Sequence, residues 1–264
     1  MSVALTTERA LKAVSRLTFC YLCGKPLLSS ETRDRDHVPP SGIFALADRN
    51  QPLILPTHRL CNSNRSQEDQ AVGQLVGVLH GRRVNRKHNK LQIAVGQFKD
   101  GSRGAALSGF DVKEPIRRWV RGFHAALYGE YLPPTCFFAT YPPLPEAINK
   151  ESEVVFVPIP DVLPKFVEEI KRNRAVGNLD RIVSRKSKCR YECVWSQADN
   201  GEWVCIYCLD LYNWTDLGDT RHFAPRGCVG FYRWEYGGVP PQASTTTRLV
   251  FEVSNTSPLD PWGE

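Results

Sequence analysis

The chain has 264 residues, a mass of 29.8 kDa and a net charge of +6. This length suits one large domain or two ordinary ones, and 42% apolar against 23% charged residues excludes a disordered chain. No run of 18 apolar residues occurs, which excludes a membrane span, and charged residues interrupt the N-terminal segment, which argues against a secretory signal. We therefore expect a cytoplasmic protein with no membrane partner, in which clustered cysteines bind metal more often than they form disulfides.

Basic residues gather in two segments of the chain. Residues 82–121 hold eleven Lys and Arg against three acids, and residues 165–190 hold nine against three. Such segments favour a polyanionic partner, because neutralised phosphates supply most sequence-independent affinity. Solvated helix faces are the equally open alternative.

In the N-terminal part of the chain, apolar spacing predicts a short amphipathic helix over residues 4–17, followed by a tight turn at 19–25. A polar loop leads to residues 36–40, where two prolines end any strand or helix. Residues 52–56 predict one brief strand, and the spacing from Thr57 to about His80 predicts a long helix.

The rest of the chain predicts helices followed by strands, and hence an α+β fold class. Helices are expected at residues 116–127 and 166–171, and the Pro-rich residues 133–145 are interpreted as a linker or covering loop. The period then changes to two. Asp199-Asn200-Gly201 between alternating segments predicts a hairpin, and the strands are expected at residues 190–196, 202–210, 227–236 and 246–253.

Four potential metal ligands form two close pairs, Cys20-x2-Cys23 and His58-x2-Cys61. Two ligands three residues apart can bind one ion, and thiolate and imidazole ligands suit tetrahedral Zn²⁺. With four protein ligands and no open position, the zinc is expected to be structural. A small two-strand segment cannot bury enough area to be stable alone, so a zinc would hold it together. The alternative is a pair of buried cysteines beside an unrelated helix histidine.

Hard oxygen donors and an imidazole accompany these pairs. Asp36-His37 lies between them and Asn62 follows the second pair. Carboxylate and amide oxygens suit a magnesium-like ion that keeps open positions, while a neutral histidine takes a proton from water. A helix from Thr57 would carry on one face His58, Cys61, Asn62 and Arg65, with Arg65 on a phosphate oxygen. Together these parts suffice to hydrolyse a phosphodiester.

The segments CYLCG, DRDHVPP and LPTHRLCNSNRS resemble the HNH (ββα-metal) nuclease family over about residues 18–70. The resemblance implies two short strands and a helix around the metal, and a structural zinc on the two pairs. It implies that His37 is the general base, that Asp36 and Asn62 hold a catalytic Mg²⁺ or Mn²⁺, and that Asn50 positions the base.

The sequence departs from that family in two ways. His58 stands where the family usually has cysteine, although histidine is a competent zinc ligand. As neighbours in a strand, Asp36 and His37 would face opposite sides unless the strand twists or ends there, and Asp34 is a competing carboxylate.

The leading hypothesis is a metal-dependent DNA endonuclease with RNA as an open alternative substrate. It divides the chain into an HNH module at 1–90, a helical basic segment with a Pro-rich linker at 91–149, and an α+β region of unknown role at 150–264. The residues directly after the predicted helix are expected to contact phosphates: Arg82, Arg83, Arg86 and Lys87. Similar stand-alone HNH proteins serve restriction, antiviral defence against phage, or DNA processing, and nothing in the sequence selects among these roles.

Two other hypotheses stay open. The chain is a non-catalytic zinc-stapled module that binds nucleic acid or protein, or a nuclease activated by a partner that engages residues 150–264. A homodimer is a further candidate assembly through the same region. A second cysteine cluster, formed by Cys189, Cys193, Cys205 and Cys208, is expected to be ordinary buried thiols, with a second metal as the alternative.

Overall fold

The computed structural model describes residues 2–28, 33–63, 65–79, 92–97, 103–108, 113–134, 136, 138–141, 147–150, 153–156, 162–197, 200–211, 227–238 and 240. Its helices are α1 (Glu8–Ala13), α2 (Arg59–Ser63), α3 (Ser66–Leu79), α4 (Lys113–Tyr128) and α5 (Val162–Ala175), with 3-10 turns η1 (Val14–Arg16), η2 (Ser41–Ile43) and η3 (Leu46–Asp48). Its strands are β1 (Ala4–Leu5), β2 (Arg33–His37), β3 (Ile54–His58), β4 (Gln92–Gln97), β5 (Arg103–Ser108), β6 (Phe138–Tyr141), β7 (Ala147–Lys150), β8 (Glu153–Phe156), β9 (Asp180–Ser184), β10 (Cys189–Gln197), β11 (Trp203–Leu211) and β12 (Gly227–Arg233).

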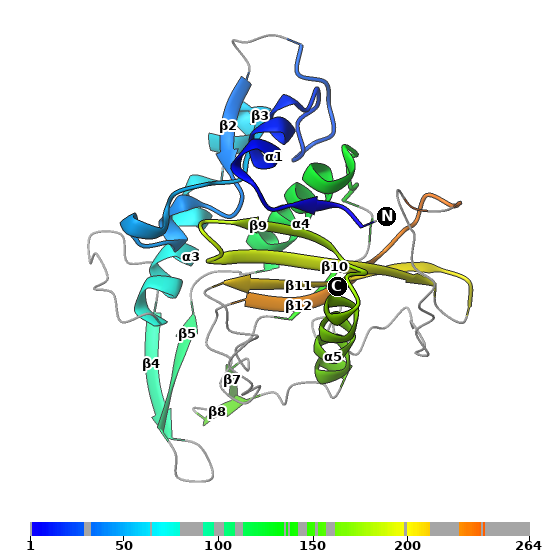
Figure 1. Ribbon diagram of the computed structural model, residues 1–264. Coiled ribbons are helices and arrows are strands. Elements are labelled where there is room, and N and C mark those ends of the chain that lie inside the picture. The colour runs from blue at the N-terminus through cyan, green and yellow to red at the C-terminus, as the bar shows by residue number, and fades with distance from the viewer. Residues whose placement is uncertain are drawn as a thin grey trace.

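A six-stranded sheet in the order β1-β9-β10-β11-β12-β6 forms the centre of the fold (Figure 1). All its pairs are antiparallel except β1 with β9. Helices α4 and α5 cover opposite faces of this sheet. Adjacent residues of a strand point to opposite sides, and two neighbours in β10 contact different helices. Tyr191 of β10 stacks on Phe123 of α4, whereas the next residue, Glu192, pairs with Arg174 of α5. The predicted α+β class with a mostly antiparallel sheet is confirmed.

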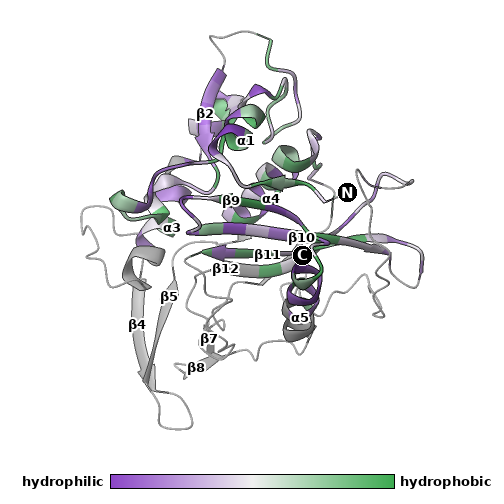
Figure 2. Cartoon of the chain, in the orientation of Figure 1, coloured by the Kyte–Doolittle hydropathy of each residue, from purple (hydrophilic) through white to green (hydrophobic). Residues whose placement is uncertain are grey.

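The β2–β3 ribbon and α2 form a small ββα unit beside the sheet (Figure 1). Figure 2 shows β2 as hydrophilic along its length, in keeping with its sequence of Arg, Asp and His. The unit is held to the rest of the molecule by a close approach of α4. A Cβ atom on Gly122 would lie 2.9 Å from Val38 and 3.2 Å from Tyr21. One buried core runs from Leu11 to Tyr232, so residues from all three predicted segments share it.

Several predicted elements are present where the sequence places them. The hairpin around Gly201 joins β10 and β11 in register from Gln197–Trp203 to Cys189–Leu211, and α4 and α5 contain the predicted helices. β12 matches the strand predicted at residues 227–236. The strand predicted at 246–253 lies outside the described residues, as does the boundary predicted after residue 90. The division into three segments stays a prediction.

Three local predictions are wrong, each because tertiary pairing outweighs local spacing. Residues 4–5 are not helical, since they pair with Arg181 and Ile182 of β9 in a parallel register. The helix predicted from Thr57 to His80 begins only at Arg59, because His58 still pairs with β2, and it consists of two helices, α2 and α3. The Pro-rich linker contains β6, which extends the sheet beside β12.

Candidate metal centre

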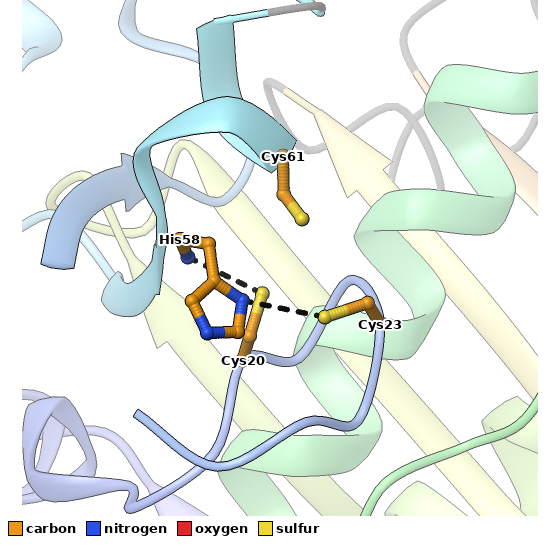
Figure 3. Close-up of side chains that lie close together, drawn as sticks. All are labelled: Cys20, Cys23, His58 and Cys61. Atoms are coloured by element: carbon orange, nitrogen blue, oxygen red, sulfur yellow. Dashed lines mark hydrogen bonds between the residues drawn. The ribbon is translucent and has the colours of Figure 1, made fainter. Parts of the chain in front are cut away.

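The two predicted ligand pairs meet in space. Cys20, Cys23, His58 and Cys61 each offer one ligand atom, and these atoms all lie within 4.8 Å of one another (Figure 3). Donors at ordinary Zn–S and Zn–N bond lengths from a tetrahedral ion lie roughly 3.4–3.8 Å apart. The Sγ atom of Cys23 and Nδ1 of His58 are already 3.4 Å apart. The group can therefore hold a metal ion with small side-chain movements.

The first pair lies on a tight turn that aims backbone N–H groups at sulfur. The turn is closed by bonds from Gly24 N to Cys20 O, at 2.7 Å, and from Cys20 N to Lys25 O, at 2.9 Å. The Cys20 sulfur accepts from the backbone N–H groups of Leu22 and Cys23 and, at 3.4 Å, from that of His58. Such donors stabilise a thiolate, which is the form that binds metal.

The second pair is brought to this turn by the junction of β3 and α2. His58 ends β3 and Cys61 lies in the first turn of α2, so the strand and the helix each contribute one ligand. The Nε2 atom of His58 lies 3.2 Å from Pro26 O, which accepts only if Nε2 carries the proton. That tautomer leaves the lone pair of Nδ1 directed at the sulfur cluster, as expected for a zinc ligand with a carbonyl partner behind it.

The electrostatics of the cluster also fit a cation. Burial, followed by the neighbouring Cys20 and Cys23 thiols, raises the pKa of Cys61 to about 12. Burial likewise raises the pKa of Cys20, against the effect of its three N–H donors. Thiols that oppose one another's ionisation lose this penalty when a divalent cation lies among them. The chemistry of the donor set, three sulfurs and one imidazole, matches a structural Zn²⁺ site.

The predicted oxygen donors are arranged differently from the sequence expectation. Asn62 Nδ2 lies 3.0 Å from Asp34 Oδ2 and 3.5 Å from Arg35 O. Asp36 faces the interior instead, is 6% exposed, and accepts a 2.5 Å hydrogen bond from the Tyr21 hydroxyl. Asn62 is thus in contact with the carboxylate two residues before the predicted one.

The buried guanidinium of Arg118 lies near the Asp36 carboxyl. Burial raises the pKa of this carboxyl, while the Tyr21 hydrogen bond and the positive charge of Arg118 act in the opposite direction. Arg118 belongs to α4, is 4% exposed, and forms an ion pair with Asp69 of α3. Asp36 is therefore part of the contact between the ββα unit and two helices.

His37 lies at the end of β2, opposite Ile54 of β3, and is half-buried. Burial, followed by the positive charge of Arg185, lowers the pKa of its imidazole, and Asp36 offsets part of this effect. A histidine with a lowered pKa is neutral at physiological pH and hence able to accept a proton. Because β2 ends at His37, the side chains of Asp36 and His37 need not point to strictly opposite faces of the strand.

The other predicted site residues lie around this unit. Asn50 donates from Nδ2 to Ala47 O at 3.2 Å, and its buried Oδ1 has no hydrogen-bond partner within the described part of the chain. Arg65 follows α2 outside any helix and pairs with Glu68 at 3.1 Å, so it does not share a helix face with His58. The four predicted phosphate contacts, Arg82, Arg83, Arg86 and Lys87, lie outside the described residues.

The sequence analysis did not identify the residues that support the ββα unit from distant parts of the chain. Arg185, in the turn between β9 and β10, donates to Arg49 O at 2.7 Å and to Ser41 Oγ at 3.1 Å, and so braces the loop between β2 and β3. Tyr21 and Arg118 support Asp36 in the same manner. No local pattern marks such residues, because their partners lie up to 146 positions away in the chain.

The second cysteine cluster does not form a metal group among the residues that the structure describes. Cys205 faces α4, on the side of Tyr232, and Cys208 lies opposite Glu192 on the α5 side. The strand alternation therefore separates these two thiols, as the spacing predicts.

Comparison with known proteins gives no relative: no family model, no curated protein and no solved structure matches the chain. Within the described residues, no helix combines the length and apolar character that crossing a membrane requires. Any statement of function therefore rests on the site itself.

Proposed function

We propose that this protein is a metal-dependent endonuclease of the HNH type, which hydrolyses phosphodiester bonds in DNA. The observation that supports it is the contact of Asn62, one residue after the ligand Cys61, with a carboxylate of β2, the strand that ends at His37. A zinc ion at the four-residue cluster would fix α2 against the turn at Cys20 and so fix this contact. The same scaffold supplies both kinds of group that the reaction needs, oxygen donors and a neutral imidazole.

The proposed roles follow from the chemistry of each group. His37 takes a proton from the attacking water, since its lowered pKa keeps it neutral at physiological pH. Asn62 and a carboxylate of β2 would hold Mg²⁺ or Mn²⁺, which would supply stabilisation of the charge on the phosphoryl group and the leaving oxygen. Arg65, 42% exposed and paired with the surface residue Glu68, would exchange that partner for a phosphate oxygen.

Plasmid nicking tests the proposal. Zinc-loaded wild-type protein with Mg²⁺ or Mn²⁺ should convert supercoiled DNA to open circles, and His37→Ala should not. The variant should keep the melting temperature of the wild type, because a half-buried histidine at the end of a strand contributes little packing. Cys20→Ser should instead lose both cleavage and the folded ββα unit.

A non-catalytic zinc-stapled binding module is the second candidate. The observation that favours it is the burial of Asp36, whose carboxylate already bonds to Tyr21. This candidate predicts that His37→Ala leaves zinc content and nucleic-acid or protein binding unchanged. Wild-type protein that binds nucleic acid but cuts neither DNA nor RNA with divalent ions present would replace the nuclease proposal by this one.

A further inference from the structure

The turn between β9 and β10 reaches the loop that joins β2 to β3, at one end of the central sheet (Figure 1). Three residues of this turn, Arg185, Lys186 and Ser187, have φ angles of 55°, 48° and 68°, which side chains other than that of glycine rarely adopt. Lys186 and Ser187 are exposed, whereas Arg185 has no exposed surface. The turn therefore directs one arginine inward from a strained backbone, and such strain persists only where the surrounding contacts compensate for it.

The Arg185 side chain first contacts the part of the loop that follows His37. Its guanidinium donates to Ser41 Oγ at 3.1 Å and to Pro39 O at 3.5 Å. The guanidinium carbon also lies 5.2 Å from the centre of the buried Phe44 ring, within the range of a cation–π contact. These contacts fix the backbone within a few residues of the proposed general base.

The same arginine holds the other part of the loop on both sides of Asn50. Its guanidinium donates to Arg49 O at 2.7 Å, and its backbone N–H donates to Gln51 O at 3.0 Å. Asn50 lies between these two residues, and its buried Oδ1 has no hydrogen-bond partner within the part of the chain that the structure describes. An acceptor that is buried, unpaired and fixed from both sides is available to a reacting group.

A contact that only filled space would not need an arginine here. Burying a guanidinium is unfavourable, and burial lowers the pKa of Arg185 to about 10. Among the described residues its hydrogen-bond acceptors are backbone carbonyls and one hydroxyl, with no carboxylate, and its Nε has no partner. What the arginine adds over an apolar side chain is a planar set of donors that reaches both parts of the loop at once.

We propose that Arg185 is a positioning residue of the cleavage site, which holds the loop between β2 and β3 so that His37 and Asn50 keep a fixed mutual placement. This role rests on the proposed function for the reaction that the placement serves. It makes cleavage depend on the β9–β10 turn, 136 positions from Arg49 in the chain. A displacement of reacting groups by about 1 Å lowers a rate by on the order of a hundredfold, so the loss of such a support is measurable.

Arg185→Met tests the proposal, because it removes the donors and keeps a long side chain, and Ser187→Ala is the control in the same turn. NMR of zinc-loaded protein follows the side-chain amide signal of Asn50, which is identified by its absence from Asn50→Asp. Arg185→Met should shift or broaden this signal. It should also lower kcat of plasmid nicking by about tenfold to a hundredfold, with KM within about twofold of the wild type. Ser187→Ala should change neither the signal nor kcat.

Ser41→Ala removes one acceptor of the guanidinium, should act in the same direction, and decides by the same two measurements if Arg185→Met does not fold. An unchanged Asn50 signal would overturn the proposal. A lower melting temperature with unchanged kcat would also overturn it, since Arg185 would then be structural only, and the nuclease would stand. An Asn50 signal that depends on Arg185, in a protein that cuts no nucleic acid, would uphold the support of Asn50 and reject the nuclease.

Discussion

Acid should destabilise this fold through one buried residue, His124 of α4. Its side chain has no exposed surface, and its Nδ1 atom lies 3.0 Å from the Tyr232 hydroxyl. The aromatic rings of Tyr128, Trp195 and Trp234 surround it. Burial lowers the pKa of the imidazole to about 3.

The sign of the effect follows from the two states. An unfolded histidine has a pKa of about 6.5, so between that value and about 3 the unfolded chain binds a proton that the folded chain does not. The contribution to stability is complete above pH 6.5 and is lost progressively as the pH falls toward 3. At pH 4.5 the loss is about 3 kcal/mol, at 1.36 kcal/mol for each pH unit. Native domains have stabilities of roughly 5–15 kcal/mol, so this loss is large.

Urea unfolding of the wild type and of His124→Phe at pH 7.0, 5.5 and 4.5 measures the contribution of His124 to the free energy of unfolding. Carboxylates also titrate in this range, among them Asp180, which accepts from Tyr128. Their contribution is common to both proteins and cancels in the difference. The wild type should lose about 3 kcal/mol more than the variant between pH 7.0 and 4.5. Equal losses, in this variant and in His124→Gln, would refute the reasoning.

Two further predictions concern the supports of the site. Arg118→Leu should cost about 3–5 kcal/mol in urea unfolding, because it leaves Asp69 without its buried partner, whereas Arg117→Leu, on the same helix with a 32% exposed side chain, should cost less than about 1 kcal/mol. Equal costs would contradict the buried pair. Gly24→Ala should weaken zinc retention against a chelator and lower the melting temperature, since Gly24 has φ +75° and a Cβ there would lie 2.7 Å from Tyr131. Unchanged zinc retention would contradict the role of this turn.

What the sequence predicts well follows from turn chemistry and from ligand chemistry. The hairpin at Asp199-Asn200-Gly201 follows from turn chemistry and alternation, and its two strands occur in register. The turn at Cys20 depends on a residue free to adopt positive φ, which Gly24 supplies. The meeting of the two ligand pairs also follows, because the chemistry of thiolates and imidazole requires four donors around one ion.

What the sequence misses depends on contacts between distant segments. Helical spacing after Thr57 is real, but pairing of His58 with Arg33 keeps it in a strand. The sequence offers Asp36 and, as a competitor, Asp34, and the contacts of Tyr21 and Arg118 with Asp36 show that it is the buried one of the two carboxylates. Such choices are made by packing, which no local period records.

The proposed function depends most on a metal ion that joins the turn at Cys20 to the junction of β3 and α2. Elemental analysis of purified protein, by mass spectrometry after dialysis, tests this directly. We expect one zinc ion per chain, held by Cys20, Cys23, His58 and Cys61, and its loss in Cys61→Ser, while Cys136→Ala, outside the cluster, retains it. A folded wild-type protein without zinc, or a Cys61→Ser variant that keeps a full equivalent, would contradict the account.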